Sequence, residues 1–219
     1  MIDFFIKMQN LNLKVTENEG FLRSKRFKRD VEYKYLQVPN SVGTVIAIGG
    51  TGGGFYGPAN IYDDLALNLQ NYGLSLLRIN VYPDHMEGTI NLIIGLEFLK
   101  KKNENQPILL MGWSMGGASI IQAAKFVQDN NMFTIKGLIT LAGQSYGADP
   151  VQELKNIPIY IVHGTEDKCM GPRVAESIYR IANEPKELVL LEGASHWMAE
   201  RYDTLRHNIY NWIVKSFYE

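Results

Sequence analysis

The chain has 219 residues, of which 46% are hydrophobic and 21% charged, and this is enough for one sizeable hydrophobic core. Its 22 Lys and Arg residues almost balance its 23 Asp and Glu residues, so the composition argues against a nucleic-acid-binding protein and against a disordered acidic chain. The single cysteine, Cys169, excludes an internal disulfide and a cysteine-based structural zinc site.

The first 43 residues predict antiparallel strands at the edge of a sheet. Segments 4–15 and 32–38 alternate loosely between apolar and polar residues, as strands with one solvated face do. Residues 23–34 hold six basic and two acidic residues. We interpret this charged stretch as a solvated hairpin, and a surface for an anionic partner is the alternative interpretation.

From about Thr44 onward, short apolar segments alternate with segments of helical periodicity. The apolar segments, which predict buried strands, are residues 45–48, 74–79, 108–111, 137–141, 159–162 and 188–191. The segments that predict helices are residues 58–72, 89–102, 115–127, 173–181 and about 200–217. This alternation is typical of right-handed βαβ units. We therefore expect one α/β domain over residues 1–219, with a doubly wound, mostly parallel sheet formed by residues 44–219.

The most informative segment is Gly112-Trp113-Ser114-Met115-Gly116, which has the pattern G-x-S-x-G between a predicted strand and a predicted helix. A serine on such a sharp turn projects its hydroxyl above the sheet, and glycines are needed two residues to either side because side chains there would collide. We interpret Ser114 as a nucleophile. The alternative is a glycine-rich turn with an ordinary serine.

A serine nucleophile needs a base, and the base needs an orienting acid. Asp167 and His196 each follow a predicted buried strand, in the order Ser, acid, His along the chain. Because the carboxyl ends of parallel strands meet at one edge of the sheet, the three side chains are expected to converge. Asp149 is the competing acid. His163 is expected to hold a turn by hydrogen bonds.

The remaining histidines have other expected roles. His85 lies in a predicted loop on the same edge, where a substrate contact is an alternative, and His207 is expected to be structural or solvent-facing within the last helix. Cys169 is expected to be a small buried side chain rather than a reactive thiol.

Three ordered motifs from about residue 44 onward resemble the α/β-hydrolase fold family. The segment 112–116 is similar to its nucleophile elbow, residues 163–167 to its acid loop and residues 193–196 to its histidine loop. The resemblance implies that the glycine-rich segment 49–54 is the oxyanion loop, although many members have His-Gly where this chain has Gly49-Gly50. Backbone amides stabilise the oxyanion of acyl transfer. We expect them to come from Met115 and Thr51, with Gly52 as the alternative to Thr51.

Gly52, Gly54 and Gly57 also fit the dinucleotide-binding pattern G-x-G-x-x-G. The third glycine of that pattern should lie inside a helix, whereas Pro58 predicts that the helix here begins after the pattern ends. No acidic residue closes the following strand, where Arg78 stands instead. We therefore expect no nucleotide cofactor, and no metal.

Only about fifteen residues, 144–158, separate two predicted strands at the place where many members of the family insert a lid. The site is therefore expected to be open. Trp113, Trp197 and Phe55 are the expected substrate-binding side chains, with packing beneath the loops as the alternative for each.

These observations predict a cytoplasmic serine hydrolase that cleaves a small carboxylic ester or thioester through an acyl-enzyme on Ser114. The resemblance covers carboxylesterases, thioesterases and dienelactone hydrolases, although the last usually carry Cys where this chain has Ser114. Peptidase or acyltransferase activity with the same residues, a binding protein with little turnover and a scaffold subunit are the alternatives.

No stretch approaches the ~20 apolar residues of a membrane span, and the N-terminus lacks a signal-peptide pattern. The oligomeric state stays open.

Overall fold

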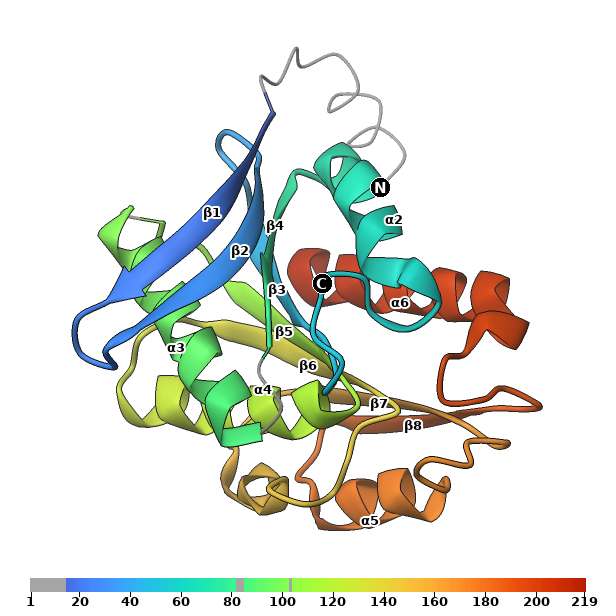
Figure 1. Cartoon of the computed structure of the whole chain (residues 1–219). Coiled ribbons are helices and arrows are strands. Elements are labelled where there is room, and N and C mark those ends of the chain that lie inside the picture. The colour runs from blue at the N-terminus through green and yellow to red at the C-terminus, as the bar shows by residue number, and fades with distance from the viewer. Residues whose placement is uncertain (1–14, 82–84, 103) are drawn as a thin grey trace.

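The computed structural model describes residues 15–81, 85–102 and 104–219. Eight strands form one sheet in the order β1-β2-β4-β3-β5-β6-β7-β8 (Figure 1). Strands β3 to β8 run parallel to one another, and β1 and β2 join them antiparallel. The strands are β1 (Thr16–Ser24), β2 (Arg29–Gln37), β3 (Gly43–Ile48), β4 (Leu74–Ile79), β5 (Ile108–Trp113), β6 (Ile135–Leu141), β7 (Ile159–Gly164) and β8 (Lys186–Leu191).

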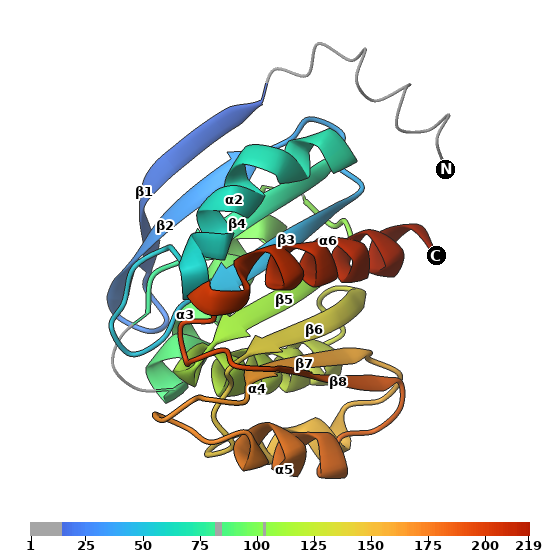
Figure 2. The same cartoon turned by 90° about the vertical axis from the view of Figure 1, so that its right-hand side faces the viewer.

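Helices cover both faces of this sheet. The helices are α2 (Ile61–Asn68), α3 (His85–Lys101), α4 (Met115–Asp129), α5 (Arg173–Ile181) and α6 (Tyr202–Tyr218). Helices α2 and α6 lie on one face, and α3, α4 and α5 lie on the other (Figures 1 and 2). Short 3-10 helices at Pro58–Asn60, Leu69–Tyr72, Asp149–Glu153 and Ala199–Arg201 complete the connections. The predicted doubly wound α/β fold is confirmed.

Alternation along the strands creates a hydrophobic core on each face. In β3, Ile46 and Ile48 belong to the cluster beneath α3 and α4, whereas Val45 and Ala47 belong to the cluster beneath α2 and α6. All six residues of β3 are buried. A strand covered on both faces has to be apolar throughout, which is why this segment reads as a continuous hydrophobic run.

The N-terminal hairpin confirms the predicted antiparallel start but differs from it in position. Strand β1 occupies residues 16–24 and pairs with β2 from Thr16 opposite Gln37 to Ser24 opposite Arg29. The segment predicted as the first strand, residues 4–15, lies outside the described residues except for Val15. The charged stretch at 23–34 forms the turn and adjoining strand ends of this hairpin, as expected.

The carboxyl ends of the six parallel strands define one rim of the sheet, and the loops that follow them carry the candidate site. Between β6 and β7 the described chain contains only the short 3-10 helix Asp149–Glu153, so the predicted absence of a lid domain is confirmed. One boundary on this rim differs from prediction, because α3 begins at His85 rather than near residue 89.

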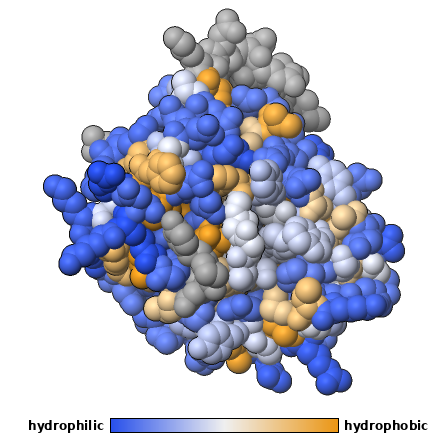
Figure 3. Space-filling model, viewed as in Figure 1, coloured by the Kyte–Doolittle hydropathy of each residue, from blue (hydrophilic) through white to orange (hydrophobic). Residues whose placement is uncertain are grey.

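Within the described ranges, no helix combines the length and apolar character needed to cross a membrane. On the face shown in Figure 3, hydrophobic side chains appear as small separate patches in a largely hydrophilic surface. Large apolar side chains are nevertheless exposed in segments that follow four of the parallel strands: Tyr56, Met86, Tyr146 and Trp197.

Candidate active site

Ser114 stands alone between a strand and a helix. Strand β5 ends at Trp113 and α4 begins at Met115. The φ and ψ angles of Ser114 are 56° and −121°, a conformation that L residues rarely adopt. Its N–H donates to the Leu141 carbonyl at 2.9 Å, and its own carbonyl accepts from the Gln144 N–H at 3.1 Å. The end of β6 and the loop that follows it therefore hold the strained backbone of Ser114 in place.

Glycines on both sides of Ser114 allow this turn. A Cβ on Gly112 would overlap the backbone carbonyl of Gly116. A Cβ on Gly116 would lie 2.5 Å from the Gly49 carbonyl oxygen and 2.9 Å from that of Ile48. Both obstacles are backbone atoms, which cannot move aside as a flexible side chain does. The turn thus requires glycine at both positions, for the steric reason that the motif suggested.

The acid and the histidine are in direct contact. Asp167 follows β7, and its Oδ2 lies 2.7 Å from His196 Nδ1, whose loop follows β8. The Asp167 side chain is fully buried, whereas 12% of the His196 side chain is exposed. The other carboxylate oxygen accepts the backbone N–H groups of Cys169 and Met170, each at 2.8 Å. The carboxylate is therefore fixed from both sides.

A second histidine, His163, also faces this carboxylate. Its side chain is fully buried, with Nε2 at 3.1 Å from Asp167 Oδ2 and 2.7 Å from the Met170 carbonyl oxygen. Because it also contacts a carbonyl, this nitrogen must carry a proton to donate. The sequence predicted that His163 holds a turn, which agrees with the Met170 contact, but its contact with the acid has no separate signal in the sequence.

These contacts lower the pKa of Asp167. Burial of the carboxyl works in the opposite direction and would raise its pKa. The hydrogen bonds from the Met170 amide, His196 and the Cys169 amide outweigh burial, so the pKa lies below its usual value. Asp167 is therefore a carboxylate at neutral pH and accepts a hydrogen bond from His196 Nδ1–H, which leaves Nε2 with its lone pair.

Acidification is expected to remove the stability that ionised Asp167 provides. Its folded pKa is lowered, so as the pH falls the unfolded chain binds the proton first. The contribution is fully present above the unfolded pKa of about 3.9 and is lost as the pH falls through the lower folded pKa. Urea unfolding should show wild type more stable than Asp167→Asn at neutral pH, with a gap that narrows toward about pH 3. A gap independent of pH would contradict the assignment, and the exposed Asp149→Asn serves as control.

Trp113 connects the nucleophile turn to the histidine loop. Its indole Nε1–H donates to the His196 carbonyl at 3.2 Å, and its ring centroid lies 5.5 Å from that of His196. Trp197 packs against the same indole at 4.6 Å. Among the hydrogen bonds of the described residues, none joins the Ser114 hydroxyl to His196. Hydrogen bonds between catalytic side chains are often long without substrate and tighten only when substrate is bound.

A second hydrogen-bond pair fixes the histidine loop. Glu200 accepts both the backbone N–H and the hydroxyl of Ser195 at 3.1 Å. Its own backbone N–H and these two bonds from Ser195 lower the pKa of the exposed Glu200 carboxyl. Ala194, which precedes Ser195, accepts the backbone N–H of Glu166 from the acid loop at 3.0 Å. No pattern in the sequence singles out Glu200.

The glycine-rich loop after β3 lies against Ser114. A Cβ on Gly50 would be 3.1 Å from Ser114 Cβ and 3.5 Å from its hydroxyl oxygen. The next residue, Thr51, donates its hydroxyl to the Met115 sulfur at 3.8 Å, so the two residues expected to bind the oxyanion are in contact. The Met115 N–H belongs to the first turn of α4, where helix amides have no intrahelical acceptor.

The other candidate side chains are distributed differently. Phe55 and Trp113 are each only 8% exposed, and Trp197 is 59% exposed, so Trp197 is the one of the three that is open to a substrate. The expectation that Cys169 is buried is wrong, because its side chain is exposed. The amide of Cys169 turns inward to Asp167 and leaves the thiol at the surface of the acid loop.

The competing residues lie elsewhere. Asp149 is exposed at the start of its 3-10 helix, whereas Asp167 is the acid that contacts His196. The ring of His85 packs edge-on against Tyr146 at 5.0 Å. His207 is exposed on α6, where its Nε2 lies 2.8 Å from the Asn211 amide.

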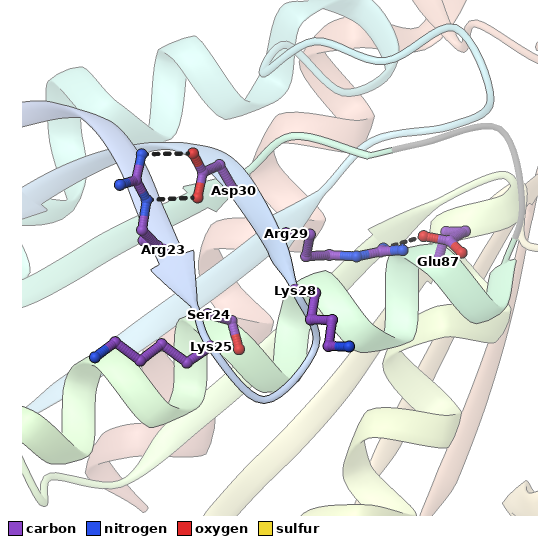
Figure 4. A pocket seen from close by; sticks show the side chains of 7 residues that line it. All are labelled: Arg23, Ser24, Lys25, Lys28, Arg29, Asp30 and Glu87. Carbon is purple, nitrogen blue, oxygen red and sulfur yellow. Dashed lines mark hydrogen bonds and ion pairs between the residues drawn. The ribbon is translucent and has the colours of Figure 1, made fainter.

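A basic hollow of about 660 Å³ lies at the tip of the β1–β2 hairpin, next to the start of α3. Its arginines are paired with acids: Arg23 binds both oxygens of Asp30 at 3.1 Å, and Arg29 pairs with Glu87 (Figure 4). Lys25 and Lys28 also line the hollow and are exposed. Four of the six basic residues of the charged stretch thus have acidic partners, and three of those partners come from outside the stretch.

No protein-family model matches the chain. An uncharacterized protein of Escherichia coli, YfhR, is 27% identical over 132 residues, which cover 51% of this chain and 46% of that protein. The chain thus spans about half the length of the curated relatives it matches.

Solved structures match over almost the whole chain. The dienelactone hydrolase of Anabaena variabilis has a TM-score of 0.76 at 18% identity and covers 92% of this chain and 98% of its own. A lidless α/β serine hydrolase from Xanthomonas campestris has a TM-score of 0.70 at 16% identity, with coverages of 91% and 94%. Est1E from Butyrivibrio proteoclasticus has a TM-score of 0.69 at 15% identity, with coverages of 92% and 99%.

Proposed function

We propose that this chain, whose fold is that of the lidless α/β hydrolases, is a serine hydrolase that cleaves a carboxylic ester or thioester. The similarity to solved hydrolases and esterases supports hydrolase activity in general. The observation that carries the serine mechanism is the buried Asp167 carboxylate at 2.7 Å from His196 Nδ1, on the rim where Ser114 occupies its strained turn.

In this proposal Ser114 Oγ attacks the acyl carbon while His196 Nε2 accepts the hydroxyl proton. The carbonyl oxygen becomes an oxyanion, which the backbone N–H groups of Met115 and Thr51 stabilise. The leaving alcohol or thiol then takes the proton from Nε2. Water repeats the sequence on the acyl-enzyme, releasing the acid and restoring Ser114. Asp167 stays ionised throughout and stabilises the imidazolium.

The exposed apolar side chains on the rim favour a substrate with an apolar part. Tyr56, Tyr146 and Trp197 are 57%, 77% and 59% exposed and follow three different strands. Large aromatic side chains exposed to water gain free energy when an apolar group covers them. We therefore expect esters with an extended apolar acyl or alcohol group to be preferred over acetate esters.

A fluorophosphonate probe tests the proposal directly, because it forms a covalent bond only with an activated nucleophile. We expect intact mass measurement to find one adduct on wild type and none on Ser114→Ala or His196→Ala. The exposed Ser145→Ala should be labelled like wild type. A folded wild-type protein without an adduct would contradict the serine mechanism and favour a binding protein on the hydrolase fold.

A further inference from the structure

We propose that Asp167, Cys169 and His196 form a binding site for a thiophilic divalent cation such as Zn²⁺, and that this cation inhibits the enzyme. One ligand atom from each residue, a carboxylate oxygen, a thiol sulfur and an imidazole nitrogen, lies within 4.8 Å of the other two. Across the part of the chain that the structure describes, this is the one group of three His, Cys or acidic side chains arranged in this way.

The chemistry of the three ligands fits zinc. Thiolate, imidazole and carboxylate are the ligands that Zn²⁺ uses in proteins, and sites with three protein ligands leave the fourth position to water. Bonds of about 2.0 Å to nitrogen and oxygen and about 2.3 Å to sulfur place the ligand atoms of a tetrahedral site roughly 3.3–3.7 Å apart. Separations of up to 4.8 Å therefore need to change by at most roughly 1.5 Å.

Two parts of the site have to adjust when a cation binds. Asp167 Oδ2 and His196 Nδ1 lie 2.7 Å apart and have to separate by about 0.6 Å to bind the same ion. Cys169 is exposed on the acid loop and binds Asp167 through its backbone N–H, so its side chain can rotate about the Cα–Cβ bond without disturbing that hydrogen bond. Because the thiol faces solvent, a cation reaches the site from outside.

Binding also explains how the cation would inhibit, a step that rests on the proposed function. The thiol releases its proton to solvent, and the imidazole proton leaves Nδ1, which becomes a metal ligand, and is replaced by one on Nε2. Nε2 then has no lone pair and cannot accept the proton of Ser114. The cation in this way blocks the base without touching the nucleophile.

Binding is tested with Cd²⁺, whose thiolate complexes absorb in the ultraviolet. Cys169 is the single cysteine of the chain, so any such absorption reports on this residue. We expect a saturable signal with wild type and no signal with Cys169→Ser. In His196→Ala the affinity should fall by at least about 10-fold, because loss of even an outer-shell partner of a metal ligand costs roughly 10–100-fold. The exposed His207→Ala should bind like wild type. An unchanged affinity in His196→Ala would overturn the three-ligand site, since the thiol would then bind alone.

Inhibition is tested separately, with hydrolysis of an activated ester at increasing Zn²⁺ and the metal-free rate of each protein as its own reference. We expect wild type to be inhibited and Cys169→Ser to need at least about 10-fold more Zn²⁺. Equal sensitivity of the two proteins would overturn the inhibitory role. A wild-type protein with no metal-free activity would contradict the proposed function, while the Cd²⁺ titration still decides the metal site.

Discussion

Replacing Ser114 with alanine is expected to lower kcat for an activated ester by about a millionfold, because the nucleophile and its base act as one unit. The remaining rate would come from substrate binding and the oxyanion amides. Asp167→Asn should cost less, about 10⁴-fold, since the nucleophile and oxyanion groups remain and the imidazole is mainly held in the wrong tautomer. Steady-state kinetics of purified, metal-free proteins measure both losses.

The control for this series is Asp149→Asn, the exposed acid that the sequence left as an alternative. Its kcat should stay within about twofold of wild type, as surface substitutions away from a site usually do. If Ser114→Ala kept more than about a tenth of the wild-type rate, Ser114 would not be the nucleophile. A large loss in Asp149→Asn together with an active Asp167→Asn would assign the acid role to Asp149.

Gly112→Ala is expected to destabilise the whole protein, by about 3 kcal/mol or more, because the added Cβ meets the backbone of the nucleophile turn. The obstructing atoms are the Gly116 carbonyl and the Gly117 nitrogen, which belong to the first turn of a buried helix. For a chain of this length the change corresponds to a fall in Tm of roughly 6–12 °C. Thermal unfolding followed by circular dichroism measures it.

Gly171→Ala is the matched control, because an added Cβ there meets nothing within 4 Å. The same chemical change at this position should leave Tm within a few degrees of wild type. Equal Tm values for the two variants would show that the elbow relaxes easily around a side chain, contrary to the geometry described above. A stable but inactive Gly112→Ala would show that the turn shifts without unfolding.

The elements that the sequence predicted best are those with a strong steric or periodic signal. Strand β3 is buried on both faces and reads as an apolar run, and α5, with its regular apolar spacing, has the predicted bounds of residues 173–181. The G-x-S-x-G turn was predictable because backbone collisions leave glycine alone at two positions. The meeting of Asp167 with His196 followed from strand direction, since both follow parallel strands.

What the sequence did not predict depends on contacts between distant segments. The closeness of His163 to Asp167 requires knowing which way a loop folds after β7, and the exposure of Cys169 depends on the same turn. The start of α3 at His85 was missed because no apolar periodicity marks its first turn. The position of β1 was missed because its outer residues are mostly exposed, so alternation there is weak.

Ser114 and His196, the proposed nucleophile and base, follow strands that are buried to different extents. Strand β5 lies inside the sheet between β3 and β6, and all six of its residues are buried. Strand β8 lies at the end of the sheet, pairs with β7 among the described strands, and has one buried residue. Local opening of edge elements requires less free energy than global unfolding. We therefore expect mild denaturant to separate His196 from Ser114 while the core sheet persists, so that loss of the proposed activity would be a reversible local event that precedes loss of the fold.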